Sequence, residues 1–140
     1  MDWTIEFDKA IEQYLPDLEV LQDEPMSRHT TFRIGGPAKR MAFPSSREQL
    51  VLLMSFAKNY GANPLVIGNG SNLLVPDEGL DRLVIDTSAN LNRVERGSEN
   101  TVLADAGATL ARTADLACKS GLTGLEFAHG IPGTVGGGVC

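Results

Sequence analysis

Two glycine-rich segments hold the residues whose types and spacing could do chemistry. The first is Gly-Asn-Gly-Ser-Asn at 68–72, and the second is Gly-Ile-Pro-Gly-Thr-Val-Gly-Gly at 130–137. Each follows an apolar stretch and presents main-chain amides with few side chains in front of them. Because glycine adopts positive φ without steric cost, such a segment can turn its amides toward one point and bind an anion. The expected ligand group is a phosphate or a diphosphate.

The side chains of the first segment suit this role. Ser71 can donate a hydroxyl hydrogen bond, and Asn72 can brace the turn. Hydrogen bonds to a charged group contribute about 1.5–3 kcal/mol each, so a few convergent amides would bind a phosphate firmly. A tight turn with no ligand would also explain the two glycines.

The second segment continues into a third glycine, so that Gly136–Gly138 has no side chains. Such a stretch loses conformational entropy on folding and packs nothing, which indicates that a ligand approaches the main chain closely. Thr134 could cap a helix that begins near Val135, with its N-terminus toward the phosphates. A flexible terminal tail is the alternative. Neither segment has the P-loop lysine or the Gly-x-Gly-x-x-Gly dinucleotide fingerprint.

The surrounding pattern predicts a mixed α/β fold (α/β or α+β). Helices are expected over 3–15, from the capping-box pair Ser45 and Glu48 to Gly61, and over 109–120. Strands are expected at 38–43, in a hairpin-like pair with 30–34, and at 64–67, buried on both faces. Further short strands are expected at 73–75, 83–85, 90–94 and 101–104. Residues 1–27 are interpreted as a helix and a polar connector, and 28–140 as one domain.

Composition excludes several function classes. The net charge of −6 argues against a nucleic-acid partner, although main-chain amides can still bind an anionic cofactor. The two cysteines lack metal-ligand spacing, and the aspartates at 81, 86 and 105 are too dispersed, so no metal site is expected. The N-terminus is not a signal peptide, and the longest apolar run, 50–57, is too short to cross a bilayer. The sequence therefore predicts a cytoplasmic protein without a membrane partner.

Three motifs together resemble a known family. They are His-Thr-Thr-Phe-Arg-Ile-Gly-Gly-Pro-Ala at 29–38, Gly-Asn-Gly-Ser-Asn-Leu-Leu at 68–74, and Gly-Leu-Glu-Phe at 124–127 ahead of 130–137. In this order and spacing they are similar to the UDP-N-acetylenolpyruvoylglucosamine reductases, bacterial flavoenzymes of peptidoglycan precursor synthesis. The match covers residues 28–140. It departs at Gly138 and Cys140, where the family more often has alanine and an aromatic residue.

The resemblance implies the FAD-binding fold of the vanillyl-alcohol-oxidase (PCMH) type, in which FAD lies between two α/β subdomains. The first loop would bind the diphosphate through the amides of Gly70, Ser71 and Asn72, and the second would line the other side of the cofactor. NADPH would supply the hydride that reduces the enolpyruvyl group of the UDP-sugar substrate. The implied cofactor-binding residues are Gly68, Asn69, Gly70, Ser71, Asn72, Gly130, Ile131, Pro132, Gly133, Thr134, Val135, Gly136 and Gly137.

The family's catalytic serine, arginine and glutamate lie further along its sequence than Cys140, so no catalytic residue is assigned. The chain ends inside its second loop, and we expect an N-terminal fragment, truncated within the second subdomain and inactive alone. Two alternatives stay open, namely another PCMH-type flavoprotein oxidoreductase and a non-catalytic flavin-binding fragment. A basic cluster at Arg28, Arg33, Lys39 and Arg40 is either a solvated face or a contact for the cofactor's phosphates.

Overall fold

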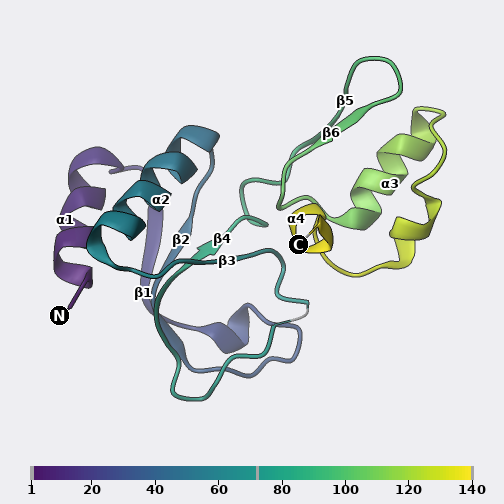
Figure 1. Ribbon diagram of the computed structural model, residues 1–140. Coiled ribbons are helices and arrows are strands. Elements are labelled where there is room, and N and C mark those ends of the chain that lie inside the picture. Colours follow the sequence, from purple (N-terminus) through teal and green to yellow (C-terminus); the bar gives the residue numbers. More distant parts are fainter. Residues whose placement is uncertain (1, 72, 140) are drawn as a thin grey trace.

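The computed structural model describes residues 2–71 and 73–139. Two parts lie side by side in Figure 1, a four-stranded sheet with two helices and a smaller part made of a hairpin and a helix. The elements of the first part are α1 (Thr4–Tyr14), β1 (Glu19–Pro25), β2 (Pro37–Phe43), α2 (Arg47–Tyr60), β3 (Leu65–Ile67) and β4 (Leu80–Asp86). Those of the second part are β5 (Val94–Arg96), β6 (Val102–Ala104), α3 (Leu110–Lys119) and α4 (Val135–Val139). Two short 3₁₀ helices, η1 (Met26–Arg28) and η2 (Glu126–Gly130), complete the chain and confirm its mixed α/β class.

The four-stranded sheet has the order β1-β2-β4-β3. Strands β2, β4 and β3 run parallel to one another, whereas β1 pairs antiparallel with β2. Helix α2 connects β2 to β3, as parallel strands require a crossover. The chain then passes through residues 68–79 before β4 enters the sheet between β2 and β3. This path places the first glycine-rich loop directly at the carboxyl end of β3.

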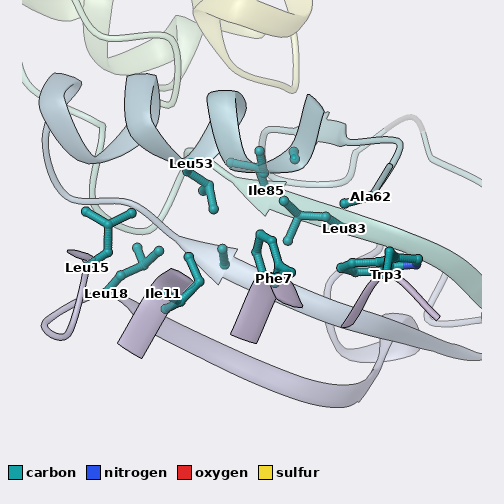
Figure 2. Packing of buried hydrophobic residues seen from close by; sticks show 11 residues of the cluster. Trp3, Phe7, Ile11, Leu15, Leu18, Leu53, Ala62, Leu83 and Ile85 are labelled. Carbon is teal, nitrogen blue, oxygen red and sulfur yellow. The ribbon is translucent and has the colours of Figure 1, made fainter. Parts of the chain in front are cut away.

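Each face of this sheet has its own core. Helices α1 and α2 cover one face, where Phe7 and Leu53 are fully buried against Leu83 and Ile85 of β4 (Figure 2). The opposite face is covered by irregular chain: Met26 of η1 packs there with the second cluster, in which Val84 alternates with those β4 residues. Because successive strand residues point to opposite faces, β4 contributes to both cores.

The N-cap of helix α2 lies one residue later than expected. Ser46 accepts a hydrogen bond from the Gln49 amide at 3.1 Å, and the Gln49 side chain reaches back to the Ser45 amide at 2.8 Å. Both Ser45 and Ser46 fit a capping-box pattern in the sequence. In the structure the cap is formed by Ser46 and Gln49 instead of by Ser45 and Glu48. The expected end is confirmed, since Gly61 has a φ of +73°.

Several expected strands were wrong. The polar connector at 18–25, for which a short extended piece was the open alternative, forms the strand β1, which takes the place beside β2 that 30–34 was expected to occupy. Residues 30–34 form a turn, in which the Arg33 amide donates to the Thr30 carbonyl. Residues 73–75 are not a strand, and Val75 instead packs beneath the sheet. Residues 90–93 are irregular, so the hairpin strand begins only at Val94.

Strand β3 lies at the edge of the sheet and is not buried on both faces as expected. Its central residue, Val66, is 51% exposed, whereas Ile67 is buried. The continuous apolar run of 64–67 therefore does not distinguish a central strand from an edge strand. The division of the chain at residue 28 stays a prediction, although α1 shares its core with β2 and β4.

Candidate functional site

The two glycine-rich loops line one cavity of about 380 Å³. One wall is the first loop together with β3, and the other is the second loop together with α4. Of the expected binding residues, those that line the cavity are Gly68, Asn69, Gly70, Ser71, Ile131, Pro132, Gly133, Thr134 and Gly137. Gly130, Val135 and Gly136 do not line it, and Asn72 lies outside the described residues.

The loops touch at Gly68 and Thr134. A Cβ atom on Gly68 would overlap the Thr134 hydroxyl and lie 2.8 Å from its Cγ2 atom. A second contact joins the loops at Gly133, whose Cβ would stand 3.4 Å from Ser71 Oγ. The absence of a side chain at Gly68 therefore brings the loops together, a role that their sequence had not indicated.

The second loop is fixed to the segment ahead of α3. Thr134 forms an isolated antiparallel bridge with Thr109, and the amides of Val135 and Gly136 donate to the carbonyls of Ala108 and Ala106 at 2.8 and 2.9 Å. These two amides are thus occupied inside the protein, which explains why their residues do not line the cavity. Thr134 Oγ1 accepts from the Gly137 amide at 3.3 Å, in agreement with the expected cap of a helix beginning at Val135.

A set of amides at the cavity is left for a ligand. The Ser71 amide donates to Asn69 Oδ1 at 3.3 Å, so it is engaged, though by a long hydrogen bond. By contrast, five other loop amides donate to no other described residue; they belong to Gly68, Asn69, Gly70, Gly133 and Thr134. Both loops therefore contribute unpaired donors to the region where they meet.

The turn at 29–31 supports the first loop from behind. Gly70 has a φ of +71°, and a Cβ there would collide with the His29 carbonyl oxygen and lie 2.9 Å from its carbon. The Thr31 amide donates to the Gly70 carbonyl at 3.1 Å. The His29 ring is in turn bonded to Glu24 at 2.9 Å, and both side chains are largely buried. A chain of contacts thus runs from β1 to the loop.

Three titratable residues near the second loop, Glu126, His129 and Cys118, do not line the cavity between the loops. Glu126 Oε2 accepts a hydrogen bond from the Gly124 amide at 2.9 Å, so this carboxylate braces the chain ahead of the second loop. Hydrogen bonds from its own amide and from that of Gly124 lower the pKa of Glu126 below its ordinary value. His129 and Cys118 line a separate apolar hollow between α3 and η2.

Two kinds of feature are absent from residues 2–71 and 73–139, namely a metal-ligand cluster and a membrane-spanning helix. No three acidic, histidine or cysteine side chains gather there as metal ligands. No helix among residues 2–71 and 73–139 has the length and apolar character needed to cross a bilayer.

Comparison with known families identifies what these loops belong to. A family model described as "FAD binding domain" matches residues 38–140. The chain belongs to the FAD-binding domain family. The match includes both glycine-rich loops, and it begins within β2, after the turn that supports the first loop.

Curated relatives of this FAD-binding domain protein carry a common name. It is 50% identical over 122 residues to the UDP-N-acetylenolpyruvoylglucosamine reductase of Moorella thermoacetica, covering 87% of this chain and 40% of that relative. It is 45% identical over 144 residues to the enzyme of the same name from Agathobacter rectalis, with 95% and 46% covered. The resemblance predicted from the motifs is therefore confirmed. The chain spans less than half the length of these relatives.

Solved structures confirm the type of FAD-binding fold. The reductase MurB from Thermus caldophilus matches with a TM-score of 0.60 at 33% identity, over 87% of this chain and 41% of that one. CrmK, a flavoenzyme of caerulomycin biosynthesis, matches with a TM-score of 0.60 at 18% identity, over 74% and 22%. Cholesterol oxidase from Brevibacterium sterolicum matches with a TM-score of 0.57 at 16% identity, over 75% of this chain and 21% of that one. The last two likenesses show the fold alone.

The residues present fit the diphosphate part of FAD. The cavity wall near Gly68 and Gly133 is main chain, and amides there that donate to no described residue could donate hydrogen bonds to the oxygens of a diphosphate. Neither loop presents a carboxylate to the cavity. A Cβ at Gly68 would occupy the place where the two walls close.

Proposed function

We propose that this chain is the FAD-binding portion of a UDP-N-acetylenolpyruvoylglucosamine reductase, which uses NADPH to form UDP-N-acetylmuramate in the cytoplasm. The observation that carries this proposal is the convergence of two side-chain-poor loops on one cavity. Support for the particular reaction comes from the relatives of that name, which are 45–50% identical.

Within this proposal, the loops bind the cofactor and set its position. Amides of Gly68, Asn69 and Gly70 would donate to the diphosphate from one wall, and those of Gly133 and Thr134 from the other. The remaining expected residues, Gly130, Val135 and Gly136, would act indirectly by holding the second loop in place. Asn72 keeps its expected role as a binding residue.

The bound FAD supplies a two-electron carrier between NADPH and the enolpyruvyl group. The protein's task at this site is to hold that carrier rigidly and to exclude water from it. Two exposed apolar side chains, Phe127 ahead of the second loop and Ile131 within it, would form part of the non-polar surroundings of the cofactor. No catalytic role is proposed for a residue of this chain, and the UDP-sugar would bind to polypeptide beyond it.

A binding experiment tests the first step of this proposal. The chain is incubated with excess FAD, freed of unbound cofactor by gel filtration, and examined for flavin absorbance. We expect retained flavin, together with quenched or shifted flavin fluorescence. A colourless protein would contradict the assignment of a cofactor site to this chain. For the protein that continues beyond residue 140, NADPH oxidation should require UDP-N-acetylenolpyruvoylglucosamine.

A further inference from the structure

A second hollow lies beside the first glycine-rich loop. It measures about 690 Å³ and is lined by the turn at 27–31 and by Arg33 on one side. Gly68, Asn69, Asp86 and Ser88 form the other side. Because Gly68 and Asn69 also line the cavity between the loops, the two hollows share this stretch of main chain. The turn and Arg33 lie outside the matched family region of 38–140.

The hollow contains two arginines with little to bind in the protein. Among residues 2–71 and 73–139, no side chain pairs with the Arg33 guanidinium, and Arg28 has only Glu24, at 3.8 Å. Arg33 also has a φ of +55°, in the left-handed region that side-chain-bearing residues rarely adopt. Backbone strain of this kind is often kept at ligand sites.

The carboxylates nearby are already satisfied. Asp86 lines the hollow but is 6% exposed, and it accepts hydrogen bonds from the Ser88 amide and hydroxyl, both at 2.7 Å, and from the Ala89 amide at 3.3 Å. Glu24 is bonded to His29. Ser27 and Thr31 line the rest of the wall, whereas the hydroxyls of Thr30 and Ser88 already donate to the Ile34 carbonyl and to Asp86. Among the described residues, the hollow thus has one guanidinium without a carboxylate partner, that of Arg33, and a second, that of Arg28, with only a long ion pair, in a chain whose net charge is −6.

We propose that this hollow binds a phosphate-bearing group of a nucleotide, with Arg33 and Arg28 as its cationic ligands. Guanidinium groups bind phosphate oxygens through two parallel hydrogen bonds, which suits Arg33, whose guanidinium pairs with no carboxylate among the described residues, and Arg28, whose pair with Glu24 is long at 3.8 Å. The group could belong to the flavin nucleotide or to a second nucleotide at the same site. The identity of the nucleotide rests on the proposed function, whereas the anion site itself does not.

Calorimetric titration with inorganic pyrophosphate tests the anion site on the intact chain. We expect Arg33→Gln to weaken pyrophosphate binding about tenfold or more, and Arg33→Lys to restore part of it, because lysine keeps the charge without the bidentate geometry. Arg47→Gln is the matched control: Arg47 is exposed in α2, does not line the hollow, and loses the same charge. Equal affinity in the wild type and Arg33→Gln, or no pyrophosphate binding by the wild type, would overturn the inference.

Titrations with FAD, riboflavin and UDP identify the source of the phosphate. If Arg33→Gln weakens FAD binding and leaves riboflavin unchanged, the group belongs to the flavin nucleotide. If it weakens UDP binding alone, the group belongs to a second nucleotide. If Arg33→Gln weakens neither FAD binding nor UDP binding and its circular dichroism is unchanged, the inference is overturned. Wild-type protein that retains FAD in that case leaves the proposed function intact.

Discussion

Gly68 and Thr134 come from different loops, yet a single Cβ atom at residue 68 would overlap the threonine's hydroxyl. Thr134 is 3% exposed and bridged to Thr109, so it cannot move aside easily. This contact joins the sheet to the part of the chain that contains α3. The geometry of the proposed diphosphate site therefore depends on an absent side chain.

Gly68→Ala should destabilise the chain because it overpacks this junction. Overpacking of a fixed contact typically costs about 1–3 kcal/mol, measured as the free energy of unfolding in urea. Thr134→Ala should reduce that cost in the double variant, since the clash is mostly with the threonine's Oγ1 and Cγ2 atoms. Gly130→Ala, in the second loop with Thr134 but with no atom within 4 Å of the added Cβ, is the control. Additive effects of the two substitutions would contradict the contact.

Gly70→Ala and Gly70→Val should abolish FAD binding through a collision with the His29 carbonyl. The relevant control is Gly61→Ala, because Gly61 has a φ of +73° but open space around its Cβ position, whereas Gly70 has a φ of +71° and no space. Both alanine variants place a side chain at positive φ, but only Gly70→Ala brings the added Cβ against a neighbouring carbonyl group. Flavin retention after gel filtration is the measurement. If Gly70→Ala retains flavin as Gly61→Ala does, the turn at 29–31 does not set the loop.

Glu24→Ala should weaken both stability and FAD binding, because it leaves the His29 ring without its partner. We expect a loss of about 1.5–3 kcal/mol in the free energy of unfolding, which is the range for hydrogen bonds to charged groups. Glu24→Gln keeps an oxygen at the Oε1 position and should recover much of the loss in flavin affinity. Failure of the glutamine variant to recover affinity would show that the 2.9 Å contact does not position the loop.

Asp81 stabilises the folded chain at neutral pH, and this stabilisation is expected to be lost in acid. The hydrogen bond from Trp3 Nε1, at 3.0 Å, and then the bond from Lys39 lower the pKa of Asp81 below its ordinary value of 3.8. Since the folded pKa is lowered, the stabilisation is fully present above pH 3.8 and is lost as the pH falls through the folded value. Asp81→Asn should therefore be less stable than the wild type near neutral pH and equal to it in strong acid. Urea unfolding across this pH range is the measurement. A difference in the free energy of unfolding between Asp81→Asn and the wild type that persists in strong acid would refute this prediction.

The sequence allowed much of this site to be predicted, because glycine loops and capping residues act locally. The segments at 68–71 and 131–134 were identified from residue type alone, as were the turn at Gly61 and the cap at Thr134. Their spatial convergence followed from the resemblance to a family, since no local pattern determines which distant segments meet.

The errors arose where tertiary packing decided the outcome. Residues 19–25 have a polar pattern typical of a connector, but pairing with β2 makes them a strand. Val75 looked like part of a strand, and its apolar side chain serves the second core instead. Likewise, the partner of Gly70 is a carbonyl at residue 29, a contact that no side-chain pattern could reveal.

Amide chemical shifts test the central claim most directly, because the chain of 15.0 kDa is small enough for a full assignment. On titration with FAD, the account predicts that shifts concentrate at Gly68, Asn69 and Gly70 and also at Gly133 and Thr134. Riboflavin, which lacks the diphosphate, should leave these amides largely unchanged. Shifts confined to one loop, or located away from both, would contradict the account.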